Sequence, residues 1–243
     1  MNDDDRSPQQ ISIKCHYRPG DEVMVQTPAK PDVEYPLPDG SPMAESDPAR
    51  EYLIYGVKSL QIYFQEREDV YVSGNLEIFY KQGVPSAKVA PDVFVVFGVE
   101  NRDRTSYKIW EEGGKVPSFV LEVTSKSTQE NDEEDKPQKY AKLGVQEYFQ
   151  FDPTGDYLDP PLKGRRLVDG MYESIELTQL EEGTLSLHSR VLGLELRLSE
   201  GQLRFYNPQT GERLLSHEEA EAEITRLKAL LRQQGIDPGE LGG

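Results

Sequence analysis

Apolar residues recur along the chain with the periods of helices and strands, and the clearest helical spacing lies near the start of the regular region. Between Ser46 and Arg67 the apolar positions are four, three and four residues apart: Leu53, Val57, Leu60 and Phe64. This spacing puts one apolar stripe on a helix, and Ser46 followed by Pro48 is a typical helix start. The pattern therefore predicts an amphipathic helix from about Ser46 to about Arg67.

Strand-like runs follow this helix, and they differ in their degree of burial. The runs at 70–72 and 76–80, with a turn at 83–85, indicate a hairpin. Val93–Phe97 and Phe119–Leu121 are apolar without interruption, as strands covered on both faces tend to be. We expect these two runs to form the centre of a sheet, with a polar excursion between them.

Later elements are predicted by caps and turn residues. A helix over 133–143 would carry Pro137 in its first turn and end at Gly144, and a strand would follow over 147–151. A capping box at Ser216–Glu219 predicts a terminal helix, with one apolar stripe made of Ala220, Ile224, Leu227 and Leu231. The stripe could pair two chains in a homodimer, and because it spans only about two heptads, docking on the chain's own domain or fraying are the alternatives.

The elements divide the chain into four expected segments. Residues 1–45 are rich in proline and predict an extended arm, and 46–160 hold the main α/β core. Residues 161–207 consist of short strands and turns, and 208–243 form the terminal helix and tail. The predicted class is a mixed α/β (α+β) fold with a hairpin region and a helix added at its C-terminal end.

Composition limits the chemistry that this fold could carry. No run of about 18 apolar residues is present and the first residues are acidic, so we expect a cytoplasmic protein with no membrane segment. The single cysteine and three scattered histidines exclude a thiolate or histidine zinc site. A net charge of -17 argues against broad binding to nucleic acid, although lysines and arginines cluster locally at 136–142 and 163–166.

Two carboxylates are placed where a buried charge needs a cation. Glu122 lies inside an apolar strand, and Asp92 opens another directly after Pro91. Strand alternation puts Glu122 and Lys126 on one face. The cation could be a metal ion, a lysine or both, and a simple ion pair of Glu122 with Lys126 or Lys136 is an alternative.

Several motifs in one order resemble a known family. The motifs are Pro91-Asp92, Glu122-Val123-Thr124-Ser125, Asp132, Lys136, Tyr140-Ala141, Gly144-Val145, Glu147-Tyr148-Phe149 and Asp152-Pro153. Together they resemble the Uma-two family of PD-(D/E)XK endonucleases, most closely over 46–160. The resemblance implies a restriction-endonuclease-like fold, a mixed central sheet flanked by helices.

The resemblance also implies roles for individual residues. Asp92, Glu122 and the backbone carbonyl of Val123 would hold Mg²⁺ or Mn²⁺ for hydrolysis of nucleic acid, with DNA favoured over RNA. In the general pattern a lysine lies two residues after the acid, but here that residue is Thr124. The family position on the next helix gives Lys136 as the lysine that positions the attacking water, with Lys126 as its competitor.

Three further side chains are secondary candidates. Tyr140 lies one helical turn beyond Lys136 and could orient it or simply pack. Ser125 could bond backbone near the site, and Glu77 could supply another ligand or face solvent. The alternative to an enzyme is an inactive nuclease fold that serves as a binding or assembly module.

Overall fold

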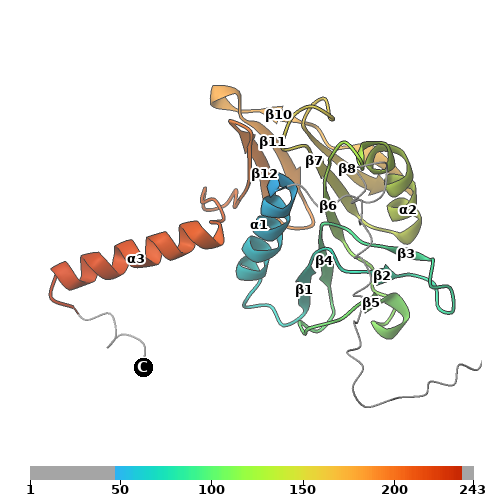
Figure 1. The fold of residues 1–243 in the computed structure, drawn as a ribbon, viewed down its shortest axis with the longest axis horizontal. Coiled ribbons are helices and arrows are strands. Elements are labelled where there is room, and N and C mark those ends of the chain that lie inside the picture. Colours follow the sequence, from blue (N-terminus) through green and yellow to red (C-terminus); the bar gives the residue numbers. More distant parts are fainter. Residues whose placement is uncertain (1–46, 237–243) are drawn as a thin grey trace, which may run out of the picture. The chain divides into compact units, whose positions relative to one another are not determined.

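A mixed six-stranded sheet is the centre of the computed structural model, which describes residues 47–236 (Figure 1). The strand order is β1-β4-β6-β7-β8-β9, with β6 parallel to β7 and all other neighbours antiparallel. The bounds are β1 (Val70–Ser73), β4 (Val93–Phe97), β6 (Phe119–Val123), β7 (Glu147–Phe151), β8 (Leu162–Val168) and β9 (Met171–Ser174). The arm expected over 1–45 lies outside the described residues.

The two uninterrupted apolar runs occupy the interior of this sheet, as predicted. All five residues of β6 and β7 are buried, as are the first four of β4. The division expected after residue 160 runs through the sheet, because β8 and β9 extend it beyond β7. These two strands lack a continuous apolar run, and β9 is the largely exposed edge strand.

One face of the sheet packs against α1 (Asp47–Tyr63) and a second, four-stranded sheet. That sheet and its short connecting turn consist of β10 (Thr178–Gln179), η3 (Glu181–Gly183), β11 (Leu185–Ser189), β12 (Leu194–Ser199) and β13 (Gln202–Tyr206). The Tyr55 hydroxyl of α1 accepts the Phe205 amide at 2.9 Å and donates to the Leu214 carbonyl at 3.0 Å. These bonds fix α1 to the second sheet, and its buried apolar residues pack on the central sheet.

The opposite face carries α2 (Lys136–Leu143) and a three-stranded sheet (Figure 1). This small sheet has the order β3-β2-β5, with bounds β2 (Ile78–Phe79), β3 (Lys88–Val89) and β5 (Tyr107–Lys108). A hairpin around the turn at 83–85 is formed by β2 and β3, with only two residues of the run at 76–80 in a strand, and the run at 70–72 is not part of it. β1 instead joins the central sheet next to β4.

The helix expected over 133–143 begins differently from the prediction. Its first turn is a π-helical turn, η2 (Asn131–Asp135), and the Lys136 amide donates to the Asn131 carbonyl, five residues back. Pro137 has no amide to donate to Glu133, four residues back, and Arg165 from β8 donates to that carbonyl at 3.3 Å instead. α2 then ends at Gly144, whose φ of 87° is the left-handed cap that glycine favours.

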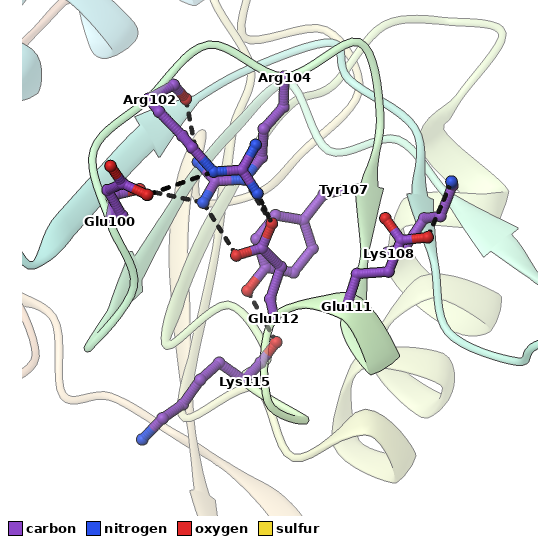
Figure 2. A network of polar contacts seen from close by, with 8 residues as sticks. All are labelled: Glu100, Arg102, Arg104, Tyr107, Lys108, Glu111, Glu112 and Lys115. Atoms are coloured by element: carbon purple, nitrogen blue, oxygen red, sulfur yellow. Dashed lines mark hydrogen bonds and ion pairs between the residues drawn. The ribbon is translucent and has the colours of Figure 1, made fainter.

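The polar excursion between β4 and β6 is an ordered segment held by one buried arginine (Figure 2). The Arg104 guanidinium donates to both carboxylate oxygens of Glu112, at 2.8 and 2.9 Å, and lies 4.2 Å from the ring centre of Tyr71. Its side chain is 2% exposed. This network fixes the chain around β5 and the short helix η1 (Ile109–Glu111).

The terminal helix α3 (His217–Gln233) begins at the predicted capping box, with Ser216 and Glu219 bonded to each other's backbone amides. None of its residues is buried, and Ile224, Leu227 and Leu230 are between 43% and 50% exposed. Of the predicted stripe, Ile224 and Leu227 are exposed, and Ala220 and Leu231 are partly exposed. No helix within 47–236 is both long enough and apolar enough to cross a membrane.

Candidate active site

Glu122 is the centre of the candidate site because it is fully buried in the middle of the sheet. It occupies the fourth position of β6 and is 0% exposed. Leu121 and Val123 pack on the α1 face, whereas Glu122 contacts α2 on the other face, as strand alternation predicted. A carboxylate in this position needs donors or a cation to offset the loss of water.

Both α2 side chains that meet Glu122 come from one turn of that helix. The Tyr140 hydroxyl donates to Oε1 at 2.6 Å, and the Lys136 Nζ lies 2.9 Å from Oε2. Residues four apart share a helix face, and α2 lays that face over β6. The lysine that the structure brings to Glu122 is therefore Lys136.

Asp92 reaches the same region from the neighbouring strand. Its Oδ2 accepts the Val123 amide at 2.7 Å, and its own amide lies 3.4 Å from Oε2 of Glu122. β4 and β6 are antiparallel, with Val93 opposite Leu121, so the start of one strand adjoins the end of the other. The pairing register thus joins two acids that are 30 residues apart in sequence.

A third carboxylate, Asp132, lies at the site and had no assigned role in the sequence analysis. It sits on η2, is 1% exposed, and its Oδ1 lies 2.7 Å from the Lys136 Nζ. Neither of its carboxylate oxygens has a hydrogen-bond partner within the described part of the chain, so Oδ1 is paired through the ion pair with Lys136 alone. The available signal was the spacing of four between Asp132 and Lys136, which suits an ion pair on one helix face.

The other secondary candidates lie away from Glu122 or do not contact it. Lys126 is exposed, and Glu77 is an exposed residue that pairs with Lys88. The Ser125 hydroxyl contacts the Ser127 and Thr128 hydroxyls within its own turn, at 3.1 and 3.2 Å. β6 ends at Val123, so strand alternation no longer directs Lys126 towards the face of Glu122.

Burial and crowding of like charges shift the ionisation of both acids. Burial, together with the adjacent Glu122, raises the pKa of Asp92 to about 8, although the Val123 amide and Lys136 oppose this rise. Burial also raises the pKa of Glu122 against the attraction of Lys136. For Lys136, burial alone would lower the pKa, but Glu122 and Asp132 outweigh it and raise the pKa above its usual range.

The charge balance of the site suits a divalent cation. Three largely buried carboxyl groups, Asp92, Glu122 and Asp132, share the single ammonium of Lys136. Full ionisation would leave two uncompensated negative charges, and oxygen donors of this kind are those that Mg²⁺ prefers. Within residues 47–236, no three His, Cys, Asp or Glu side chains are arranged as ready ligands for one ion. The fit therefore rests on the Asp92–Glu122 pair and its excess charge.

The basic clusters around the site differ in how far they are neutralised. Lys163 and Arg165 of β8 pair with Glu133, and Arg166 pairs with the buried Glu147. Lys139 and Lys142 are exposed on α2. Lys139 and Lys142 are thus better placed than the β8 cluster to bind an anion from solvent.

One protein-family model matches most of the chain. The chain matches the model of the Uma2 family, described as "Putative restriction endonuclease", over residues 21–201. It is also similar to the crystal structure of "a putative nuclease belonging to DUF820" from Anabaena variabilis ATCC 29413, at 14% identity and a TM-score of 0.40. That similarity covers 57% of this chain and 74% of the other. No curated protein matches.

Proposed function

Because the chain belongs to the Uma2 family of restriction-endonuclease-like proteins, we propose that it is a metal-dependent endonuclease that hydrolyses nucleic-acid phosphodiester bonds. One observation carries the proposal. Lys136 lies 2.9 Å from Glu122, and Asp92 lies against the next residue of the same strand at 2.7 Å. An acid pair and a lysine thus converge on one end of two central strands.

The proposed ligands of Mg²⁺ or Mn²⁺ are the carboxylates of Asp92 and Glu122 and the backbone carbonyl of Val123. A bound ion of this kind lowers the pKa of coordinated water and offsets charge that develops on the phosphoryl group. With a pKa of about 8, Asp92 is mostly protonated at neutral pH, so it would have to lose this proton to bind the ion. Ion binding is therefore expected to release protons and to strengthen with rising pH.

Lys136 is proposed to position the attacking water and to stabilise negative charge in the transition state. Its raised pKa keeps the side chain charged, so it serves as a hydrogen-bond donor and a fixed positive charge. Tyr140 donates to Glu122 and holds that carboxylate in one orientation. Each of these groups is buried or nearly so, which limits their motion.

The proposed substrate is DNA, and the proposed location is the cytoplasm. Because the chain carries a net charge of -17, binding to DNA would depend on local basic residues. Lys139 and Lys142 on α2 could bind backbone phosphates beside the site. The main alternative is an inactive binding or assembly module. The position of Asp92 beside the Lys136–Glu122 pair favours the nuclease, because a purely structural ion pair would not need a second buried acid next to it.

The test is cleavage of supercoiled plasmid and of single-stranded DNA and RNA by the purified chain with Mn²⁺, Mg²⁺ or EDTA. Metal-dependent cleavage should be nearly abolished by Asp92→Asn, Glu122→Gln and Lys136→Met. Lys126→Met is the matched control, because it removes an exposed lysine from the loop that follows β6. Equal loss in the Lys126 variant would contradict the assigned lysine, and full activity of Asp92→Asn would contradict the ligand pair.

A further inference from the structure

Lys136 is held by two carboxylates, of which only one belongs to the proposed metal site. Its Nζ lies 2.9 Å from Oε2 of Glu122 and 2.7 Å from Oδ1 of Asp132. The lysine side chain is 17% exposed, and the two acids are at most 1% exposed. Asp132 is therefore a second anchor for the ammonium, independent of Glu122.

The local backbone is built to keep Asp132 in this place. The π-helical turn η2 carries Asp132 four residues before Lys136, and the Tyr148 hydroxyl of β7 donates to the Asp132 carbonyl at 2.8 Å. Arg165 of β8 fixes the next carbonyl, that of Glu133. Two strands of the central sheet thereby hold the turn, and π-helical turns are often found at functional sites.

Burial of the Asp132 carboxylate is unfavourable for folding stability. The cost of burying a carboxylate is offset only when its oxygens are paired, yet neither oxygen of Asp132 has a hydrogen-bond partner in the part of the chain that the structure describes, and only Oδ1 has an ion pair, with Lys136. Burying an aliphatic side chain at this position would avoid that cost. Stability therefore does not explain the carboxylate at this position, whereas its contact with Lys136 does.

We propose that Asp132 is a positioning residue that keeps Lys136 over the reaction centre when a divalent cation occupies the oxygens of Glu122. This inference rests on the proposed function. A cation bound at Glu122 repels the ammonium, which would leave a lysine held by Glu122 alone free to swing towards solvent. The 2.7 Å contact with Asp132 retains it within reach of the attacking water.

The geometry favours this role over that of a third metal ligand. The Lys136 Nζ stands between the carboxylates of Asp132 and Glu122 and contacts both. Within 47–236, Asp132 is not grouped with two other acids in an arrangement suited to one ion. Asp132 therefore acts through the lysine.

The first test compares Asp132→Asn with Asp135→Asn, a matched control on an exposed residue of the same turn. Asp132→Asn should lower kcat at least tenfold while KM and the Mn²⁺ dissociation constant, measured by electron paramagnetic resonance, stay within about twofold. A tenfold loss of Mn²⁺ binding would overturn the proposal, because Asp132 would then be a ligand. An unchanged kcat would overturn it as well.

The second test needs no cleavage, so it separates this inference from the proposed function. Acetylation of lysines by an N-hydroxysuccinimide ester, followed by mass spectrometry, reports how far Lys136 is exposed with saturating Mn²⁺. Asp132→Asn should raise acetylation of Lys136 several-fold and leave that of Lys126 unchanged. Asp132→Ser is the second variant if the first fails to fold, and equal acetylation in parent and folded variant would overturn the proposal.

Discussion

The Asp92 carboxyl should control how folding stability depends on pH, and Asp92→Asn isolates this effect. Burial beside Glu122 raises its pKa from 3.8 to about 8 in the folded chain, whereas the unfolded chain leaves it near 3.8. Between these two values the folded form holds a proton that the unfolded form has lost. The free energy of unfolding therefore falls as pH rises from about 4 to about 8, and levels off above.

The magnitude follows from the two pKa values. One pKa unit corresponds to about 1.4 kcal/mol, so the largest possible effect over the whole range is about 5 to 6 kcal/mol. Between pH 5.5 and 7.5 the expected loss is about 2 to 3 kcal/mol. Asp92→Asn stays neutral throughout, so the variant should match the parent near pH 5.5 and exceed its stability by this amount at pH 7.5.

The assay is urea unfolding followed by circular dichroism, at several pH values, in EDTA and with Mn²⁺. Groups that do not interact with Asp92 titrate alike in both chains and cancel in the difference. In Mn²⁺ the parent should regain stability at high pH, by about 2.7 kcal/mol when the ion is at a hundred times its dissociation constant, and the variant should not. If the difference between the two chains in EDTA is the same at pH 5.5 and 7.5, Asp92 is already ionised and the reasoning from burial fails.

Three further predictions follow from the structure. Glu147→Ala should lower the free energy of unfolding by about 3 to 5 kcal/mol, because it leaves the guanidinium of Arg166 without its buried partner, as urea unfolding will measure. Gly74→Ala should reduce cleavage on the order of a hundredfold in the plasmid assay, because a Cβ there would lie 2.1 Å from the Asp92 carbonyl oxygen and displace that residue. Leu227→Glu should convert the proposed dimer to a monomer in light scattering, because it places a charge in the exposed apolar stripe of α3.

Matched controls accompany these variants. Glu223→Ala breaks an exposed pair and should change stability little, and Gly83→Ala places a Cβ in open space and should leave cleavage intact. Met171→Glu alters an exposed apolar residue outside α3 and should leave the oligomeric state unchanged. A parent chain that is already monomeric at micromolar concentration would contradict the dimer through α3.

Local patterns in the sequence determined the elements whose burial is continuous or whose caps are explicit. Val93–Phe97 and Phe119–Leu121 were identified as buried strands because they are apolar without interruption, and they lie in the interior of the sheet. The capping box of α3 was equally local, since Ser216 and Glu219 bond within one turn. The edge strand β9 was not distinguishable from an appended hairpin, because an exposed strand has no continuous apolar signal.

Part of the candidate site was likewise predicted from the sequence, and the rest required the tertiary structure. The sequence indicated Glu122 and Asp92 from their apolar surroundings and the family resemblance, because a buried acid stands out against such neighbours. For the lysine that positions the attacking water, the sequence favoured Lys136 and kept Lys126 as a competitor. It assigned no role to Asp132. Only the packing of α2 and its π-helical first turn over β6 showed that Lys136 contacts both Glu122 and Asp132, because a contact between residues 14 positions apart, such as Glu122 and Lys136, depends on how elements cross in space.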